Sequence, residues 1–253
     1  MFKTGLKKKI NDGTLTIGSW ITLSDPGIAD IMAKAGFDWL TIDLEHSATS
    51  INQAANLIRA VEFYGVAPLI RLTSNDENQI KRVMDAGAHG VIVPNVKSVE
   101  EAKKAVRAVY YPPTGERGVG LARAQEYGVS FDTYKEWLSE EAVIIVQIEH
   151  IAAVNDLEAI LSVDGVDGFI VGPYDLTGSL GNPGAFDDPA FLDAMETIKT
   201  VSKKLNKTGG VHVVEPNQAQ LQARIDEGYR FLAYSVDIRM LDTVCRSGLK
   251  GLK

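Results

Sequence analysis

Short apolar runs alternate with amphipathic segments along the whole chain. Eight runs are almost continuously apolar, and segments with apolar residues at helical spacing separate them. Continuous apolar runs, as opposed to alternating ones, are typical of strands that are covered on both faces. The expected strands cover residues 15–23, 37–45, 66–72, 90–96, 143–149, 168–175, 208–214 and 229–237.

Helix start and stop signals lie between these runs. Ser24-Asp25-Pro26 places a capping residue before a first-turn proline, and Gly36, Gly65 and Gly87 stand where helices are expected to end. Eight strand-then-helix units, most of them about 25 residues apart, predict a (β/α)₈ TIM barrel, with residues 1–253 as a single domain. A doubly wound open sheet is the alternative, but no glycine-rich dinucleotide turn follows the first strand.

One connection is irregular. Residues 111–141 lie between the fourth helix and the fifth strand, and they contain YPPTGERGVG followed by the helical segment FDTYKEWLSEE. Connections of this length are usually functional or disordered. The aromatic and apolar content of this one predicts an ordered insertion.

Composition excludes several classes of protein. The net charge of −7 and the pI of about 5.2 disfavour a nucleic-acid binder, and the short run Lys7-Lys8-Lys9 is expected to be a solvated helix face. The single cysteine, Cys245, rules out an internal disulfide framework and fits a reducing compartment. No run of about 18 apolar residues predicts a membrane span, and residues 1–10 lack the apolar core of a signal peptide. A cytoplasmic location is expected.

Two carboxylates end adjacent apolar runs. Glu149 follows VIIVQI and Asp175 follows GFIVGPY, with one helical segment between them. The carboxyl ends of parallel strands meet at one edge of the sheet, so these acids should converge, and two such acids repel unless a proton or cation lies between them. Two oxygen ligands with open positions suit Mg²⁺ or Mn²⁺. The alternative is that each acid caps the helix that follows it.

The other strand ends carry a base and a guanidinium. His46 follows the second strand and is the best candidate general base, with Asp43 close enough in sequence to orient it. Arg71 ends the third strand, where it could hold a carboxylate or a developing oxyanion. The alternatives are a surface histidine without a partner and an arginine that extends to solvent.

The absence of two kinds of feature at the expected strands limits the reactions that the site could catalyse. None of the expected strands contains a lysine, so a Schiff base is disfavoured and a metal route is preferred for carbon–carbon cleavage next to a ketone. No glycine-rich phosphate cup follows the seventh or eighth strand, so phosphorylated substrates are disfavoured.

Five motifs together resemble the HpcH/HpaI class II aldolases, which are metal-dependent enzymes of the phosphoenolpyruvate/pyruvate barrel superfamily. The resemblance covers nearly the whole chain. Its carriers are DLEHS (43–47), PLIRL (68–72), PPTGERGVG (112–120), QIE (147–149) and GPYDLTGSLG (172–181).

The resemblance implies a role for each acid and base. Glu149 and Asp175 would bind a divalent ion (Mg²⁺, Mn²⁺ or Co²⁺), which a small-molecule 2-oxo acid chelates through its carboxylate and keto oxygens. Arg71 would stabilise the enolate oxygen. His46, with Asp43 beside it, would take the hydroxyl proton of the aldol.

The resemblance also implies substrate contacts from Gln147, from Gly172, Pro173 and Tyr174, and from the metal ligand Asp175. It places an acid at Asp85 that raises the basicity of the histidine. Asp85 is expected at the opposite end of its own barrel. Either the barrel departs from simple geometry there, or a neighbouring subunit of the homo-hexamer typical of the family supplies the residue.

Reversible cleavage of a 4-hydroxy-2-oxo acid to pyruvate and an aldehyde is therefore expected. The substrate could be 4-hydroxy-2-oxoheptanedioate or a 2-dehydro-3-deoxy sugar acid. A related enolate-forming lyase or decarboxylase, and a catalytically silent metabolite-binding barrel, remain alternatives. Four residues depart from the family pattern and leave the aldehyde open: Ser47, His150, Tyr174 and His212.

Overall fold

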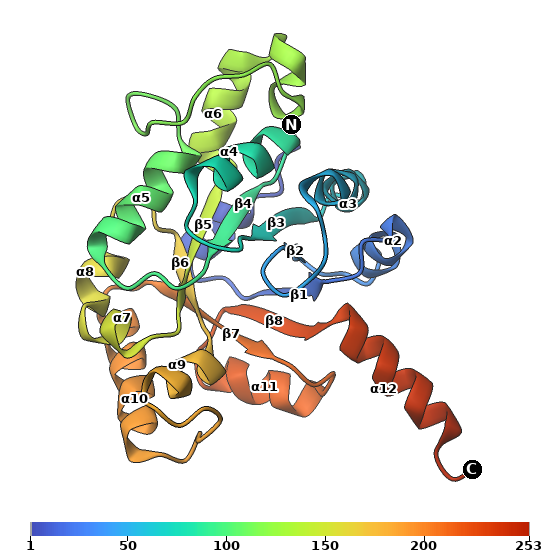
Figure 1. Cartoon of the computed structure of the whole chain (residues 1–253), viewed down its shortest axis with the longest axis vertical. Coiled ribbons are helices and arrows are strands. Elements are labelled where there is room, and N and C mark those ends of the chain that lie inside the picture. Colours follow the sequence, from blue (N-terminus) through green and yellow to red (C-terminus); the bar gives the residue numbers. More distant parts are fainter. Residues whose placement is uncertain (1, 253) are drawn as a thin grey trace.

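Eight parallel strands close into a barrel in the computed structural model, which describes residues 2–252 (Figure 1). Each strand pairs with the next one along the chain, and the eighth pairs with the first. The (β/α)₈ prediction is confirmed, whereas the single-domain organisation stays a prediction. The strands are β1 (Thr16–Ile21), β2 (Trp39–Asp43), β3 (Ala67–Arg71), β4 (Gly90–Val93), β5 (Val143–Ile148), β6 (Gly168–Val171), β7 (Thr208–Val213) and β8 (Phe231–Val236).

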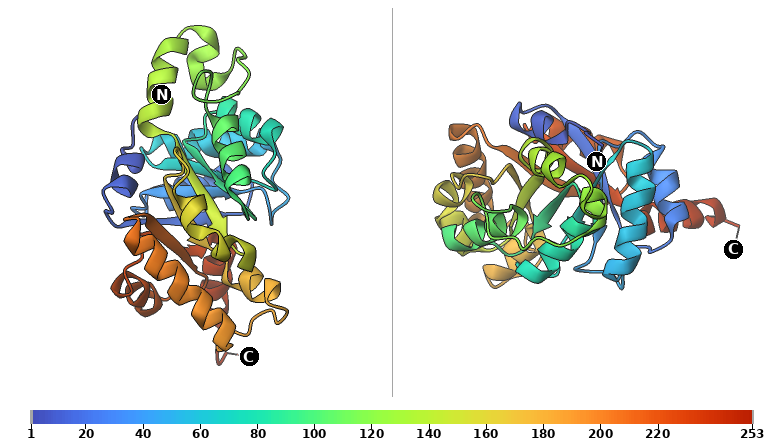
Figure 2. Two further views of the ribbon diagram at one scale, coloured as in Figure 1. Left: turned by 90° about the vertical axis from the view of Figure 1, so that its left-hand side faces the viewer. Right: turned by 90° about the horizontal axis from the view of Figure 1, so that it is seen from above.

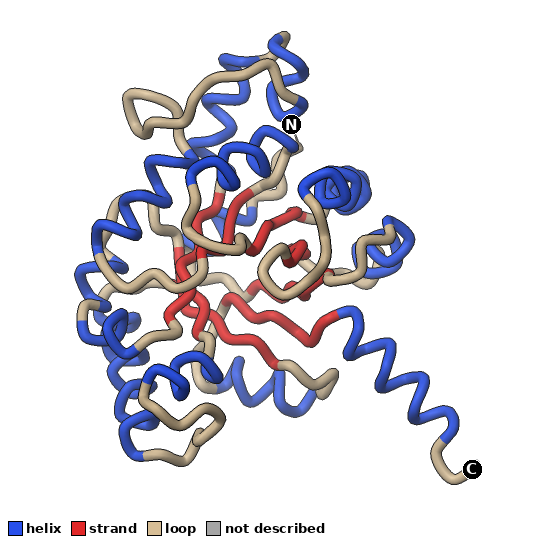
Figure 3. Tube along the Cα trace, in the orientation of Figure 1, coloured by secondary structure: helices blue, strands red, loops and turns tan. Residues whose placement is uncertain are grey.

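Helices surround most of the barrel (Figure 3). Side chains cap the amino ends of most long helices as expected, and Ser50 and Gln53 form a reciprocal capping box. The helices that follow strands are α2 (Pro26–Ala33), α3 (Ile51–Phe63), α4 (Glu77–Ala86), α5 (Val99–Val109), α7 (Ile151–Asn155), α8 (Leu157–Leu161), α9 (Pro173–Ser179), α10 (Pro189–Lys204), α11 (Gln218–Asp226) and α12 (Asp237–Leu249).

The fifth and sixth units differ from the prediction. The helix expected over 152–162 is divided at Asp156, whose backbone is not helical. β6 ends at Val171, so the expectation that the sixth strand extends to Asp175 was wrong. Gly172 and Pro173 explain the early end, since proline is favoured in a first helical turn, and α9 begins there.

Large aromatic side chains fill the barrel interior. The rings of Trp39 and Phe231 stack with centroids 4.2 Å apart, and a Cβ at Gly18 would overlap the Trp39 ring. Below them, α1 (Leu6–Asn11) closes the amino-terminal end of the barrel with two fully buried side chains, Leu6 and Ile10. The barrel is therefore a packed core that is open at one end.

The lysine run beside this helix is only partly solvated. Lys7 Nζ donates to the Tyr110 hydroxyl at 2.9 Å and to the Ala142 carbonyl at 3.0 Å, and it lies 3.6 Å from Asp167. The expectation of a solvated face was wrong for Lys7, because its stem packs under the barrel and its charge neutralises a buried acid.

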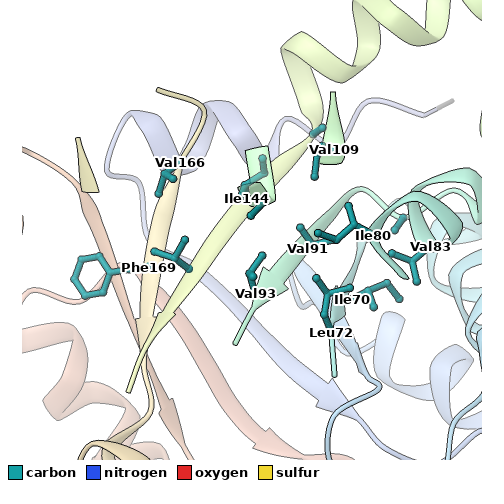
Figure 4. Close-up of a cluster of buried hydrophobic side chains, with 14 of the residues drawn as sticks. Ile70, Leu72, Ile80, Val83, Val91, Val93, Val109, Ile144, Val166 and Phe169 are labelled. Carbon is teal, nitrogen blue, oxygen red and sulfur yellow. The ribbon is translucent and has the colours of Figure 1, made fainter. Parts of the chain in front are cut away.

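The outward side chains of the strands form the main core with the helices. Figure 4 shows Ile70, Val91 and Ile144 on three strands facing Val83 and Val109 on the helices. Because this layer is almost fully buried, the strand ends above it are held in fixed positions.

The insertion forms η1 (Arg123–Gly128) and α6 (Phe131–Glu141), and α6 packs beside α1 (Figure 2). Arg117 holds it to the barrel: its guanidinium lies over the Tyr111 and Tyr134 rings at 4.7 and 5.4 Å, and it donates to Asp85 on α4. Arg123 binds Glu62 on α3. The expected ordered insertion is therefore built on two arginine–carboxylate pairs.

The last helix extends away from the barrel (Figure 1). Only Asp237 is buried on α12, whereas Ile238, Leu241 and Val244 are 49%, 53% and 69% exposed. These residues share one face, since they are three positions apart. Within residues 2–252, every helix is too short or too polar to cross a membrane.

Candidate active site

A cavity of about 920 Å³ opens at the carboxyl ends of the strands. Seven of the predicted site residues line it: His46, Arg71, Gln147, Gly172, Pro173, Tyr174 and Asp175. Asp43 and Glu149 are buried and contact lining residues. The sequence-based set is therefore brought together here with the exception of Asp85.

Arg71 is rigidly held. It faces Asp43 across the β2–β3 pair, and its Nε and Nη2 donate to the two Asp43 oxygens at 2.9 and 2.5 Å. Its guanidinium also lies over the Trp20 ring at 4.4 Å. A guanidinium fixed in this way presents its remaining N–H groups to the cavity without further ordering.

His46 lies in the loop after β2, and its side chain is 68% exposed. The carboxylate near its ring is that of Glu45, with Oε2 3.9 Å from Nε2. Asp43 instead accepts from Arg71 and from the backbone N–H groups of Glu45 and His46. We expected Asp43 to contact and orient the His46 ring, but the structure does not show this contact.

Glu45 is a half-buried acid without enough partners. Its Oε2 is 3.4 Å from Arg71 Nη1, yet within residues 2–252 this buried oxygen has no hydrogen-bond donor. Burial raises the pKa of Glu45 to about 7; Arg71 opposes the rise, and the charges of Asp43 and Asp175 add to it. The sequence placed Glu45 at this strand end but did not single it out.

Glu149 follows β5 and is more deeply buried. It accepts a hydrogen bond from the Asn95 backbone N–H at 2.6 Å and another from the Gln147 amide. Burial raises the pKa of Glu149 to about 7 despite these two bonds, and the charges of Glu45 and Asp175 add to the rise. A Cβ at Gly172 would lie 2.7 Å from the Glu149 carboxylate, so glycine leaves room for it.

Asp175 lies in the first turn of α9 and not at a strand end. Neither acid caps a helix: the N-cap of α7 is His150, whose Nδ1 accepts from the Ala152 N–H, and the N-cap of α9 is Gly172. The capping alternative was therefore wrong, and the Asp175 charge is near enough to Glu149 to raise its pKa.

These carboxylates suit a hard divalent cation. The donors are oxygens: Glu149 is buried, one Glu45 oxygen lacks a hydrogen-bond partner in the described part of the chain, and Asp175 is exposed at the cavity. No group of three or more His, Cys, Asp or Glu side chains in residues 2–252 is arranged to hold a metal by itself. An ion held by Glu149 and Asp175 would therefore need oxygens from water or substrate as well.

Asp85 lies elsewhere in this chain. It is in the last turn of α4, near the amino-terminal ends of the strands, where it accepts from Arg117. The barrel therefore follows the simple geometry that was expected. A role for Asp85 at this cavity would need a second subunit.

The sequence did not identify Trp20 and the apolar wall of the cavity. Trp20 lies two residues after the inward-facing Gly18, so strand alternation was the available signal. Phe186, Leu192 and Met195 form the apolar wall, and the Tyr174 ring meets Phe186 edge to face at 4.9 Å. Loop 180–188 and α10 carry this wall, and no strand periodicity predicts a loop position.

Comparison with known proteins assigns the family. The sequence model of the HpcH/HpaI aldolase/citrate lyase family matches residues 16–242. The chain belongs to this family. The resemblance stated from the motifs is confirmed, and this member of the HpcH/HpaI family is a carbon–carbon lyase.

Relatives cover the chain from end to end. It is 38% identical over 246 residues to the hydroxypyruvate/pyruvate aldolase of Sagittula stellata, covering 95% of this chain and 94% of that protein. It is 35% identical to the 2-keto-3-deoxy-L-rhamnonate aldolase of Salmonella gallinarum, covering 100% and 92%. The crystal structure of the HpcH/HpaI aldolase from Desulfitobacterium hafniense superposes with a TM-score of 0.90 at 32% identity, covering 100% and 97%.

Proposed function

We propose that this enzyme is a class II aldolase that reversibly cleaves a 4-hydroxy-2-oxo acid to pyruvate and an aldehyde. One observation carries the proposal: three acids converge at the mouth of the barrel beside a guanidinium that a fourth acid, Asp43, already holds. Such a site lacks a positive charge, which a divalent ion would supply.

Glu149 and Asp175 would hold that ion, with Mg²⁺, Mn²⁺ and Co²⁺ as the candidates. The ion, when bound, supplies the charge that polarises a chelated ketone. The backbone N–H of Asn95 and the Gln147 amide hold the Glu149 carboxylate in place. Because α9 begins at Pro173, Asp175 is its third residue and lies in its first turn.

The remaining residues handle the substrate's own charges and protons. Arg71, fixed by Asp43 and Trp20, would donate to the oxygen that becomes the enolate when the C3–C4 bond breaks. His46 would take the C4 hydroxyl proton, and Glu45, whose Oε2 is 3.9 Å from His46 Nε2, would orient its ring. Gln147 and residues 172–174 would contact the 2-oxo acid at the cavity wall.

The family relatives narrow the substrates without naming one. The names of the compared proteins include hydroxypyruvate/pyruvate aldolase and 2-keto-3-deoxy-L-rhamnonate aldolase. We propose a sugar-like 2-dehydro-3-deoxy acid or 4-hydroxy-2-oxoheptanedioate as substrate. The cavity is lined by apolar residues, Phe186 and Leu192, and by charged ones, Glu215 and Arg224. This mixed lining is compatible with both substrates.

We further propose a homo-oligomer, with the hexamer as the expected form. The exposed apolar face of α12 supports association, because Ile238, Leu241 and Val244 would otherwise remain in water. Association would also allow a second subunit to bring Asp85 to this cavity. The single domain and the cytoplasmic location stay predictions.

The test is pyruvate release from a panel of 4-hydroxy-2-oxo acids, with and without added divalent ions. We expect release that a chelator abolishes and Mg²⁺, Mn²⁺ or Co²⁺ restores. Release that is insensitive to chelator would overturn the metal site. Carbon dioxide release without an aldehyde would favour a decarboxylase, and tight ligand binding without turnover would favour a silent barrel.

A further inference from the structure

His212 occupies a place at the cavity that the proposed mechanism does not use. It lies on β7 and lines the cavity together with Arg71 and Trp20. Its ring centroid is 5.6 Å from that of Trp20, the ring over which the Arg71 guanidinium lies. His212 therefore lies close to Arg71, two strands along the barrel from Glu149 and β5.

An unusual backbone residue holds the imidazole in place. His212 Nε2 lies 2.9 Å from the carbonyl oxygen of Ser235, which also accepts from Ser19 Oγ at 3.2 Å. Ser235 has φ of +54°, which is costly for a residue with a Cβ, and its own Oγ donates to Val214 at 2.9 Å. The β1–β8 register shifts at the same point. The strand end is thus bent so that one carbonyl faces the histidine.

This contact fixes the tautomer. A carbonyl oxygen only accepts, so Nε2 carries the proton and Nδ1 keeps a free lone pair. Burial lowers the pKa of His212 to about 4, and the nearby Arg71 charge opposes a second proton. Within residues 2–252, no group donates to Nδ1. A neutral imidazole at the cavity wall therefore offers one unused acceptor.

We propose that His212 is a specificity-determining residue whose Nδ1 accepts a hydrogen bond from a hydroxyl group of the substrate. This inference rests on the proposed function and deepens it. The hydroxyl could belong to a 3-hydroxy-2-oxo acid that acts as the enolate donor, or to a 2-hydroxyaldehyde that acts as the acceptor. Either substrate would be preferred over its counterpart without that hydroxyl, because the bound counterpart would exclude water from Nδ1 and leave this acceptor unpaired.

The experiment measures kcat/KM of the metal-loaded enzyme in the synthesis direction. One arm compares hydroxypyruvate with pyruvate, each with acetaldehyde; the other compares glycolaldehyde with acetaldehyde, each with pyruvate. His212→Phe keeps a ring without a lone pair, whereas His212→Gln keeps a donor for Ser235 and an amide oxygen. We expect the preference for the hydroxylated partner to fall about 3- to 10-fold in His212→Phe in one arm, with partial recovery in His212→Gln. The arm that responds identifies the source of the hydroxyl.

A measurement on the wild-type enzyme needs no variant and holds if His212→Phe fails to fold. Replacing the hydroxyl by a methoxy group removes the donor, so 3-methoxypyruvate or methoxyacetaldehyde should lose the preference. An equal fall for all pairs in His212→Phe would indicate a merely structural role and overturn the proposal, as would an unchanged preference for the hydroxyl over the methoxy compound. Exchange of the pyruvate C3 protons with D₂O distinguishes failure of the proposed function from failure of the His212 proposal. If wild type shows neither exchange nor product, the proposed function fails; if it shows both and His212 does not affect the preference, only this inference fails.

Discussion

Two buried glutamates at opposite ends of the barrel have opposite properties. Glu62 lies at the amino-terminal end, where burial would raise its pKa, but the nearby His89 ring and the bound Arg123 guanidinium lower the pKa of Glu62 to about 2. Glu149 lies at the carboxyl end, where burial raises its pKa to about 7 and its two neutral donors do not compensate. The same side chain is thus a stable anion at one end and an uncompensated one at the other.

The two ends differ in how many of their acids have a cationic partner. At the amino-terminal end, the chain supplies a cation to each of the acids Glu62, Asp85 and Asp167, namely Arg123, Arg117 and Lys7. At the carboxyl end, Arg71 is already bound to Asp43, and the charges of Glu45, Glu149 and Asp175 oppose one another. Each of these acids at the amino-terminal end thus has a cationic partner in the chain, whereas the acids at the carboxyl end would gain one only from the proposed external cation.

A matched pair of variants, one at each end of the barrel, should show the largest difference between the two glutamates. Glu149→Gln should lower kcat at least about 10³-fold, because the loss of a metal ligand removes several kcal/mol of charge stabilisation. Glu62→Gln should keep metal-dependent turnover and lower the free energy of unfolding by about 1–3 kcal/mol. Steady-state kinetics and urea unfolding of both variants check this. Loss of metal dependence in Glu62→Gln would remove the distinction between the two ends.

Arg71 is the cation that the carboxyl end does possess, and its geometry should matter as much as its charge. Arg71→Lys should lower kcat about 10²- to 10³-fold, since an ammonium group cannot bond both Asp43 oxygens and still donate to the enolate. The exchange of pyruvate C3 protons with D₂O measures enolate formation directly. Wild-type exchange in this variant would argue against the assigned role.

Glu45 tests which acid acts on His46. Glu45→Gln should lower kcat about 10- to 100-fold, as an oriented base loses its carboxylate. It should also move the acidic limb of the kcat–pH profile to lower pH, because the Glu45 charge raises the pKa of Glu149. The matched control is Glu196→Gln, which changes another acid at the cavity rim. An unchanged profile in Glu45→Gln would return the orienting role to Asp43.

The smallest effect concerns stability. Glu45 and Glu149 have folded-state pKa values of about 7, above their ordinary value of 4.5. Their contribution to the free energy of unfolding is therefore full below about pH 4.5 and is lost as the pH rises through about 7 in the metal-free protein. Saturating Mg²⁺ should raise Tm by a few degrees at pH 8 and by less at pH 5.5, since protons compete with the ion. Calorimetry of wild type and Glu149→Gln checks this, and an equal rise in both proteins would contradict it.

The barrel and most of the cavity followed from the sequence because both depend on strand positions. Arg71 and Asp43 end their strands as expected, and the pairing of β2 with β3 then makes them neighbours. The position of Asp175 was predicted less well: an apolar run does not show where a strand ends and a helix begins, and Gly172-Pro173 was the overlooked signal.

Side-chain partners were harder to foresee than positions. Asp43, Glu45 and His46 are adjacent in sequence, so spacing alone could not show that Asp43 binds Arg71 and that Glu45 lies beside His46. The place of Phe186 at the cavity depends on how a loop packs on α10, which no local pattern encodes. Asp85 was expected far from the cavity, and its location on α4 agrees with that expectation.

Helix α1, which closes one end of the barrel, has a consequence for the order in which substrates bind and products leave. Leu6 and Ile10 close the amino-terminal end of the barrel, so reactants would enter and leave at the carboxyl ends of the strands. A 2-oxo acid bound beside Glu149, as proposed, would leave only after an aldehyde bound nearer the solvent had left. Entry and exit should accordingly follow a first-in, last-out order, with the deeper 2-oxo acid arriving before the aldehyde and leaving after it.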